Sequence, residues 1–443
     1  MTNLTALRPP QPWTAPTAAG PVEETLRLPG SKSMTARALV LSALAGGSST
    51  LRRPLRARDT ELMAAGLRAL GTHVSVTDDE RWLVRPRPLQ GPAHIDVGLA
   101  GTIMRFAPPV AGLATGPVTF DGDPYARRRP LGPLVEALRS LQVRIDAAPG
   151  GTLPLTVRGT GRVTGGDVLI DASASSQFVS GLLLAAPRFD HGVVVRHVGP
   201  PVPSAPHLRM TVQMLRAAGA GVDDSTPDVW VVEPGRLTGR GWDIEPDLSG
   251  AVPFFAAALV TGGEVTLLGW PRGSNQPVDR LRALLSEMGG EVALGTNGLT
   301  VRGSGVVHGL DADLSDVGEL TPVLAALATI ADSPSRLRGV AHIRAHETDR
   351  VAALARELTA LGADITESLD GLEIRPRPLR GGTFDTYDDH RMAHAASLIG
   401  LVVPGIELSD VACTSKTMPE FPALWSTMVA GKDDRRPGSH PVT

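Results

Sequence analysis

A repeat of about seventy residues constrains the fold of this chain more than any other feature. Five segments share one pattern, in which a predicted helix ends at Gly71, Gln142, Gly219, Gly289 or Gly362. Each segment begins with apolar residues at i, i+3 and i+4, as in an amphipathic helix, and continues into alternating β-type residues and a hairpin-like partner. Five copies and a degenerate sixth predict two domains of three repeats.

Two stretches between the copies, SSQFVSGLLLAAP and LSGAVPFFAAALV, are almost entirely apolar. A helix that is apolar on every side belongs in a protein interior. We therefore expect an α/β fold of two similar domains, with buried helices inside and small sheets outside. A break in the pattern near residues 233–247 marks the expected crossover between the domains.

Composition excludes several classes of function. The 443 residues carry a formal net charge of −3, which argues against a nucleic-acid or membrane-surface protein. The single cysteine, Cys413, excludes an internal disulfide and suits a reducing compartment, so we expect a cytoplasmic protein. No run of 18 apolar residues predicts a membrane span. We expect the first twenty residues to form a loose arm and residues 433–443 a flexible tail.

Lysine is rare in this chain: only three of the 43 basic Lys and Arg residues are lysines. One of them, Lys32, lies in LPGSKS, which lacks the glycine spacing of a nucleotide-binding P-loop. What remains is a Gly-Ser turn that opens a helix, with Lys32 and Ser33 at its start. Such a helix start can bind an anion, or it can be a plain helix cap beside a surface lysine.

Three further loops carry the same ambiguity. LAGTIMRF places Gly101 before an apolar helix, where a ligand could approach the backbone or a helix could simply begin. RRRP, with Arg129, is either an anion clamp or a solvated charge run. SASSQF, with Ser175, Ser176 and Gln177, is either a phosphate site or a strong helix cap.

Histidine-rich motifs near the C-terminus suggest zinc at first sight. HIRAHETDR contains His342 and His346, and YDDHRMAH contains His390 and His394. The HExxH order is absent, and neighbouring arginines disfavour a metal cation. We therefore expect no metal, and we predict a helix start with Glu347 in its first turn and Arg350 directed into a cleft.

A second lysine, Lys416, lies in the hydroxyl-rich loop CTSKT, where nothing marks Cys413 as an activated nucleophile. Together the loops predict a cleft that holds more than one phosphate or carboxylate, with Glu319 and Glu347 as proton carriers. Its predicted cations come from both halves of the repeat series: Lys32, Arg37, Arg129, Arg350, Arg391 and Lys416.

Seven motifs, in this order, resemble the EPSP synthase (3-phosphoshikimate 1-carboxyvinyltransferase) family of enolpyruvyl transferases: LPGSKSMTARALVLSALA, LAGTIMRF, DGDPYARRRP, SASSQF, HETDR, DDHRMA and CTSKT. The resemblance extends from about Leu26 to about Trp425. It implies two domains, each of three βαβαββ units, as an inside-out α/β barrel that closes on its substrates. We place the domain for shikimate 3-phosphate at residues 30–245. The other domain, on the phosphoenolpyruvate side, comprises 1–29 plus 246–432 and is closed by the N-terminal strand.

The resemblance also implies an activity in aromatic amino acid and chorismate biosynthesis, the shikimate pathway. The enolpyruvyl group of phosphoenolpyruvate moves to the 5-hydroxyl of shikimate 3-phosphate, and phosphate leaves, through a tetrahedral intermediate. It implies no cofactor, no metal, no nucleic-acid partner, and a monomer that binds small molecules.

By motif, the resemblance assigns residues to two substrates. Shikimate 3-phosphate contacts Lys32, Ser33, Arg37, Ser175, Ser176, Gln177, Ser204, Glu319 and His346. Phosphoenolpyruvate contacts Lys32, Gly101, Arg129, Gln177, Arg350, Arg391 and Lys416. The candidates for proton transfer are Lys32, Glu319 and Glu347, whose separate roles stay open.

Several positions depart from the family pattern. His346 replaces a common lysine, and Glu319 a common aspartate; Leu99 and Phe106 replace an asparagine and a proline and leave sensitivity to glyphosate open. If His346 must be cationic, activity should fall as the pH rises through its pKa. Two alternatives stay open: a UDP-N-acetylglucosamine enolpyruvyl transferase, which typically carries a cysteine in the region here numbered 100–130, and a non-catalytic anion-binding protein of the same fold.

Overall fold

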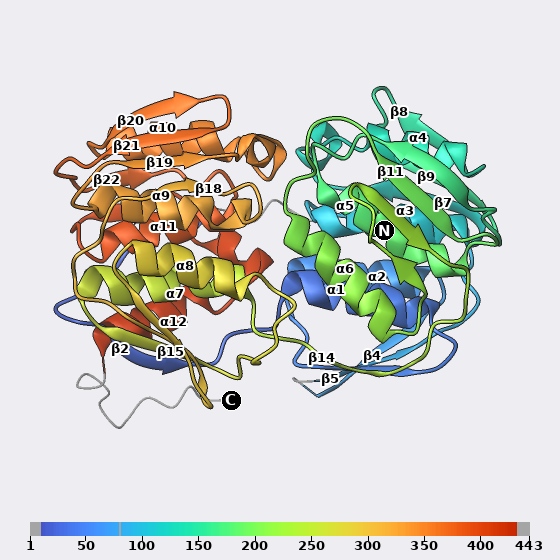
Figure 1. Cartoon of the computed structure of the whole chain (residues 1–443), viewed down its shortest axis with the longest axis horizontal. Helices are drawn as coiled ribbons and strands as arrows, with labels where there is room; N and C mark the ends of the chain where they lie inside the picture. Colours follow the sequence, from blue (N-terminus) through green and yellow to red (C-terminus); the bar gives the residue numbers. More distant parts are fainter. Residues whose placement is uncertain (1–9, 79–80, 432–443) are drawn as a thin grey trace. The chain divides into compact units, whose positions relative to one another are not determined.

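The structure, a computed structural model, describes residues 10–78 and 81–431. The predicted tail at 433–443 and the first nine residues of the predicted arm lie outside this range. The chain divides into two compact units (Figure 1). Unit 1 comprises the described residues of Met1–Leu28, Leu248–Arg272 and Val278–Thr443, and unit 2 comprises those of Pro29–Asp247 and Gly273–Pro277.

Small sheets repeat one strand arrangement through both units: a parallel pair extended by two antiparallel strands. In unit 2 the strand orders are β14 (Gly241–Asp243), β3 (Ser49–Arg52), β5 (Arg81–Arg85), β4 (His73–Asp78); β6 (Ala93–Asp96), β7 (Thr115–Asp121), β9 (Thr152–Thr160), β8 (Arg144–Ala148); and β10 (Gly166–Ile170), β11 (Val193–His197), β13 (Val229–Val232), β12 (Val222–Asp223).

Unit 1 has two sheets of the same kind and a third that is shorter. Their strand orders are β16 (Glu291–Leu294), β17 (Gly298–Arg302), β15 (Glu264–Leu268), β2 (Glu23–Leu26); β18 (Asp311–Asp313), β19 (Ser335–Arg338), β21 (Gly371–Arg375), β20 (Asp364–Ser368); and β1 (Trp13–Thr14), β23 (Ile406–Leu408), β22 (Gly382–Phe384). The three-stranded sheet is the degenerate sixth copy, so the predicted α/β repeat is confirmed.

Three nearly fully buried helices occupy the inside of each unit. They are α1 (Lys32–Leu44), α3 (Gly101–Gly112) and α5 (Ser176–Ala185) in unit 2, and α7 (Leu248–Thr261), α9 (Thr321–Ile330) and α11 (His390–Gly400) in unit 1. Within each unit the three contact one another. Both apolar stretches predicted to be buried helices are confirmed, as α5 and α7.

Outer helices bury only one face and end in a backbone conformation that explains the repeated glycine. They are α2 (Arg58–Ala69), α4 (Gly132–Ser140), α6 (Ala205–Ala217), α8 (Val278–Glu287), α10 (Arg350–Ala360) and α12 (Phe421–Ala430). The residue after the C-cap of α2 is Gly71 with φ 98°, and after that of α10 it is Gly362 with φ 109°. A left-handed residue at this place is cheapest as glycine.

The prediction of a loose N-terminal arm is wrong from Trp13 onward. β1 pairs antiparallel with β23, and the Ala15 amide donates to the Ile406 carbonyl at 2.9 Å. Further on, β2 pairs in parallel with β15. These strands form one edge of each of two sheets of unit 1. Among the described residues, no helix combines the length and the apolarity needed to cross a bilayer.

Candidate functional site

The predicted site residues form two clusters, one in each unit, and most lie at or just before the first turn of a helix. Unit 2 holds Lys32, Ser33, Arg37, Gly101, Arg129, Ser175, Ser176, Gln177 and Ser204. Unit 1 holds Glu319, His346, Glu347, Arg350, Arg391 and Lys416. Free backbone N–H groups at a helix start favour anions, so the placement suits phosphate and carboxylate ligands.

Lys32 is the first residue of α1, where a positive charge opposes the helix dipole. The Ser31 hydroxyl caps the helix by accepting from the Met34 amide. Asp247 accepts from the Lys32 amide at 3.0 Å, and the Lys32 Nζ lies 3.3 Å from the buried Asp59 carboxylate. A lysine here does not stabilise the helix through its dipole, and its charge is paired with Asp59.

Arg37 is 1% exposed and braces α1 against two neighbouring helices. Its guanidinium donates to the Thr211 and Ser180 hydroxyls and to the backbone carbonyls of Ser33 and His207. Burial lowers the pKa of Arg37 to about 9. Four of the five N–H groups of a guanidinium are therefore used, which leaves one for the predicted substrate carboxylate.

The starts of α3 and α5 meet around Gly101. Arg129 is buried and donates from Nη1 to the Leu99 carbonyl at 3.1 Å. A Cβ placed on Gly101 would lie 3.1 Å from Arg129 Nη2 and 3.1 Å from Gln177 Oε1. Such contacts are tighter than ordinary packing, so a residue without a side chain is needed for these groups to converge.

Ser175 keeps the capping role that the sequence left open. The Ser175 hydroxyl accepts from the Gln177 amide at 3.2 Å and thereby caps α5. Ser204 precedes α6 in a left-handed conformation, with φ 56°. A capping hydroxyl still has a proton to donate, so the cap and the predicted phosphate contact are compatible.

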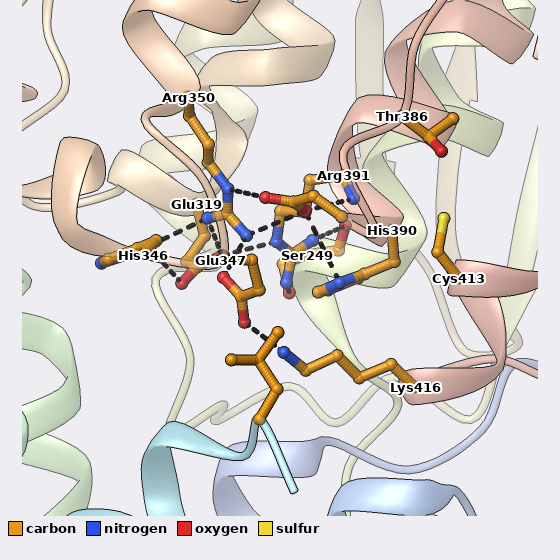
Figure 2. A network of polar contacts seen from close by, with 12 residues as sticks. Ser249, Glu319, His346, Glu347, Arg350, Thr386, His390, Arg391, Cys413 and Lys416 are labelled. Carbon is orange, nitrogen blue, oxygen red and sulfur yellow. Dashed lines mark hydrogen bonds and ion pairs between the residues drawn. The ribbon is translucent and has the colours of Figure 1, made fainter. Parts of the chain in front are cut away.

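In unit 1 the cluster is centred on Arg350, which is fully buried (Figure 2). Its guanidinium contacts three carboxylates. Arg350 Nε donates to Asp389 at 2.7 Å, Nη1 to Glu319 at 3.0 Å and Nη2 to Glu347 at 2.8 Å. Burial alone would lower the pKa of Arg350, but the charges of Asp389, Glu319 and Glu347 outweigh it and raise this pKa well above its ordinary value.

Each glutamate bridges two cations. Glu319 Oε2 accepts from Arg350 and, at 2.5 Å, from Arg391 Nε. Glu347 accepts from Arg350 and from Lys416 Nζ at 2.5 Å. Burial would raise the pKa of Glu319, but Arg350 and Arg391 outweigh it and hold this pKa well below its ordinary value. The cations of this cluster are therefore paired with its carboxylates, and Arg350 and Arg391 keep Glu319 ionised.

The prediction that Glu347 lies in the first turn of a helix is wrong. The Asp349 carboxylate accepts from the Ala352 amide, so it caps α10 and the helix begins at Arg350. Glu347 therefore precedes the helix, where its side chain reaches Lys416. Arg350 is enclosed by carboxylates rather than directed into open space.

The histidine pairs do not form a metal site in the described part of the chain, where no group of three or more His, Cys, Asp or Glu could hold a metal ion. The His342 and His346 rings lie 5.8 Å apart, and those of His390 and His394 lie 5.9 Å apart. Cys413 is buried, and burial raises the pKa of its thiol. A buried thiol of this kind is a poor nucleophile.

Sequence reasoning missed several residues that hold the predicted ones. Asp389 caps α11 and grips Arg350, while Ser249 accepts from both Nη atoms of Arg391. Asp59 pairs with Lys32. The aspartate directly before the apolar helix in DDHRMA is a capping signal that could have pointed to Asp389; no comparable signal marks Ser249.

Comparisons with known proteins show the family and the fold of this chain. The model of the EPSP synthase (3-phosphoshikimate 1-carboxyvinyltransferase) family matches residues 16–425. The solved EPSP synthase of Acinetobacter baumannii has a TM-score of 0.79 at 23% identity and covers 94% of this chain and 98% of its own. The solved enolpyruvyl transferase NikO of Streptomyces tendae has a TM-score of 0.73 at 18% identity, and the match covers 94% of this chain and 97% of the NikO chain.

These structures share the two-unit α/β fold of this chain. A Mycobacterium ulcerans (strain Agy99) protein named 3-phosphoshikimate 1-carboxyvinyltransferase is 53% identical over 430 residues, which is 95% of this chain and 98% of that protein. The chain belongs to the EPSP synthase family.

We predict that the buried His394 makes the protein sensitive to mild acid. Burial and the charges of Arg391 and Arg350 hold the pKa of His394 well below its ordinary value of 6.5. Below that pH the unfolded chain binds a proton that the folded protein does not, so stability falls as the pH falls, by up to ~1.4 kcal/mol per pH unit. His394→Leu should flatten this slope in chemical denaturation.

The control is His191→Leu, at an exposed histidine. It should leave the pH dependence of the free energy of unfolding as in the wild type. Equal slopes in all three proteins would contradict the assignment.

Proposed function

We propose that the protein transfers the enolpyruvyl group of phosphoenolpyruvate to the 5-hydroxyl of shikimate 3-phosphate and releases phosphate. The observation that carries the proposal is the contact of Glu319 and Glu347 with Arg350, Arg391 and Lys416. The reaction needs cations for an anionic substrate and carboxyl groups for proton transfer in one place. Membership of the EPSP synthase family supports the same choice.

In this proposal each substrate is held by residues from both clusters. The unit 2 residues that hold shikimate 3-phosphate are Lys32, Ser33, Arg37, Ser175, Ser176, Gln177 and Ser204, with Glu319 and His346 from unit 1. Phosphoenolpyruvate is held by Lys32, Gly101, Arg129, Gln177, Arg350, Arg391 and Lys416. The support is chemical: these side chains and helix starts are donors suited to phosphate and carboxylate oxygens.

The chemistry proceeds by addition and elimination. An acid adds a proton to the methylene carbon of phosphoenolpyruvate, while a base takes the proton of the 5-hydroxyl as its oxygen bonds to the neighbouring carbon. The tetrahedral intermediate then loses a proton from the new methyl group and expels phosphate. Lys32, Glu319 and Glu347 are the groups that exchange these protons, and none of the steps needs an oxidant or a metal.

We take the working unit to be the monomer, as the resemblance to the family implies. We place the reaction in the cytoplasm, where the single buried Cys413 thiol stays reduced.

The test of this function is phosphate release from the metal-free protein with both substrates, and with each omitted in turn. We expect release only when both are present. Release with UDP-N-acetylglucosamine instead of shikimate 3-phosphate, or tight binding of the substrates without any turnover, would overturn the proposal.

Lys32→Arg should remove most of the activity, although it keeps the charge. A guanidinium stays protonated, whereas an amine can give up its proton. We expect kcat to fall by about 100-fold or more, as for loss of a general acid or base. The control is Arg127→Lys, the converse exchange at an exposed arginine paired with Asp121. A near-normal kcat in Lys32→Arg would contradict a proton-transfer role for Lys32.

His346 should make activity pH-dependent. Its Nδ1 lies 3.0 Å from Arg350 Nη1 and 3.5 Å from Glu319 Oε1. An arginine can only donate, so the contact with Arg350 needs a neutral imidazole, while a protonated ring would donate to Glu319 instead. We propose that the cationic ring binds phosphate, so kcat/KM falls as the pH rises through the pKa of His346.

His346→Lys should remove that fall, because lysine keeps its charge to a higher pH. The measurement is kcat/KM against pH for both proteins. Superimposable profiles would count against a role for the imidazole charge.

A further inference from the structure

Arg350 has no N–H group left for a ligand in this structure. A guanidinium carries five N–H donors. Nε donates to Asp389, Nη1 contacts Glu319 and His346, and Nη2 donates to Glu347 and again to Asp389. If Arg350 is to hold phosphoenolpyruvate, at least one of these partners must leave.

Asp389 differs from the glutamates in how firmly it is held. Its side chain is fully buried, it accepts from the Arg391 amide at 2.9 Å as the cap of α11, and it grips Arg350 through two nitrogens. A bidentate pair of this kind fixes the plane of the guanidinium as well as its position. Its carboxylate therefore has no freedom to move away without uncapping the helix.

Glu319 and Glu347 contact the two terminal nitrogens of Arg350, Nη1 and Nη2 respectively. Glu319 is 30% exposed and extends from the short turn Gly318–Leu320, and Glu347 lies in the irregular segment before α10. Each bridges two cations, Glu319 joining Arg350 to Arg391 and Glu347 joining Arg350 to Lys416 (Figure 2). A bound carboxylate or phosphate would make the same kind of contacts to these cations.

We infer that Asp389 is a positioning residue that fixes Arg350, and that the carboxylates of Glu319 and Glu347 occupy the anion site until phosphoenolpyruvate displaces one of them. This rests on the proposed function. The substrate anion accepts from the N–H groups of Arg350 that the displaced glutamate has left, and Asp389 keeps the guanidinium in place throughout. Preorganisation by Asp389 spares the substrate the cost of orienting the arginine.

Displacement also prepares a proton carrier. While Glu319 contacts Arg350 and Arg391, their charges keep its carboxyl ionised. A glutamate that loses its cations but stays in a partly buried place becomes a weaker acid and takes up a proton more readily. Binding of the substrate anion would then supply the acid that the addition step needs.

Three substitutions around Arg350 test the inference, because each replaces a carboxylate by an amide of the same shape. Removing a negative charge should by itself tighten the binding of an anion in every case. We expect Glu319→Gln and Glu347→Gln to lower the dissociation constant of phosphoenolpyruvate about threefold or more. Asp389→Asn should instead raise it by about tenfold or more, because the loss of a charged hydrogen-bond partner releases Arg350.

The measurement is titration of phosphoenolpyruvate into the full chain without shikimate 3-phosphate, so that no turnover occurs. Tighter or unchanged binding in Asp389→Asn would overturn the positioning role. Unchanged binding in both glutamine variants would overturn the exchange.

The matched control is Asp349→Asn, at the cap of α10. Asp349 begins the helix that carries Arg350 but contacts Arg344 instead of the Arg350 guanidinium. Asparagine is as good a cap as aspartate, so both cap variants should keep their helices. Asp349→Asn should bind as the wild type does. In turnover, Asp389→Asn should raise the KM for phosphoenolpyruvate and leave that for shikimate 3-phosphate unchanged, a split that general loosening would not produce.

A second measurement uses the wild-type protein, in case Asp389→Asn does not fold. Side-chain carboxyl resonances of 13C-labelled glutamate, assigned with the two glutamine variants, are followed as phosphoenolpyruvate is added. Movement of the Glu319 or Glu347 resonance supports the exchange, and constancy of both overturns it. Failure of the proposed function is distinguishable, because it shows as absent phosphate release from the wild-type protein with both substrates.

Discussion

Parallel packing of three buried helices is the constraint on which each unit depends. In unit 2 the start of α3 meets the start of α5, where Gly101 lies against Gln177. In unit 1, Arg391 at the start of α11 contacts Ser249 at the start of α7, and it contacts Glu319 just before α9. Aligned helices put their N-terminal ends together, and the partial positive charges of those ends add up. Each unit thereby has one electropositive end before any charged side chain is counted.

The side chains at these ends add full charges that the interior could not tolerate alone. Burying the charge of Arg350 away from water costs free energy, and the carboxylates that surround it offset that cost. Arg37 solves the same problem differently, with hydroxyls and carbonyls in place of counter-ions. Unit 2 therefore holds a buried cation whose charge is not cancelled by a neighbouring carboxylate, whereas unit 1 holds cations that already carry counter-ions.

The sequence predicted the architecture well because its signals are local. Glycine after most outer helices marks a left-handed turn, and wholly apolar stretches mark α5 and α7, so the repeat and its buried helices followed from periodicity and composition. Many residues of the charged clusters were also found, since lysine in an arginine-rich chain and dense polar motifs stand out, but Asp389, Ser249 and Asp59 were not.

The pairing within the clusters was beyond the sequence, because it joins residues far apart in the chain. Asp389 and Arg350 are 39 positions apart, and Lys416 and Glu347 are 69 apart. A cap such as Asp349 also decides where a helix begins, and that shift of a few residues moved Glu347 out of α10. Trp13 was misjudged for a related reason: a short polar stretch has no periodicity, and its partner strand β23 lies at the opposite end of the chain.

The two N-terminal strands have a consequence for synthesis on the ribosome. β2 needs β15 and β1 needs β23, so the first part of unit 1 to be made is completed by segments made after all of residues 29–247. Unit 2 is nearly continuous and can fold as soon as it emerges from the ribosome. Until β15 and β23 have been made, β1 and β2 have no partner strand. Closing so long a loop slows folding. The two charged residues of β2, Glu23 and Glu24, give this unpaired strand some protection against pairing with another chain.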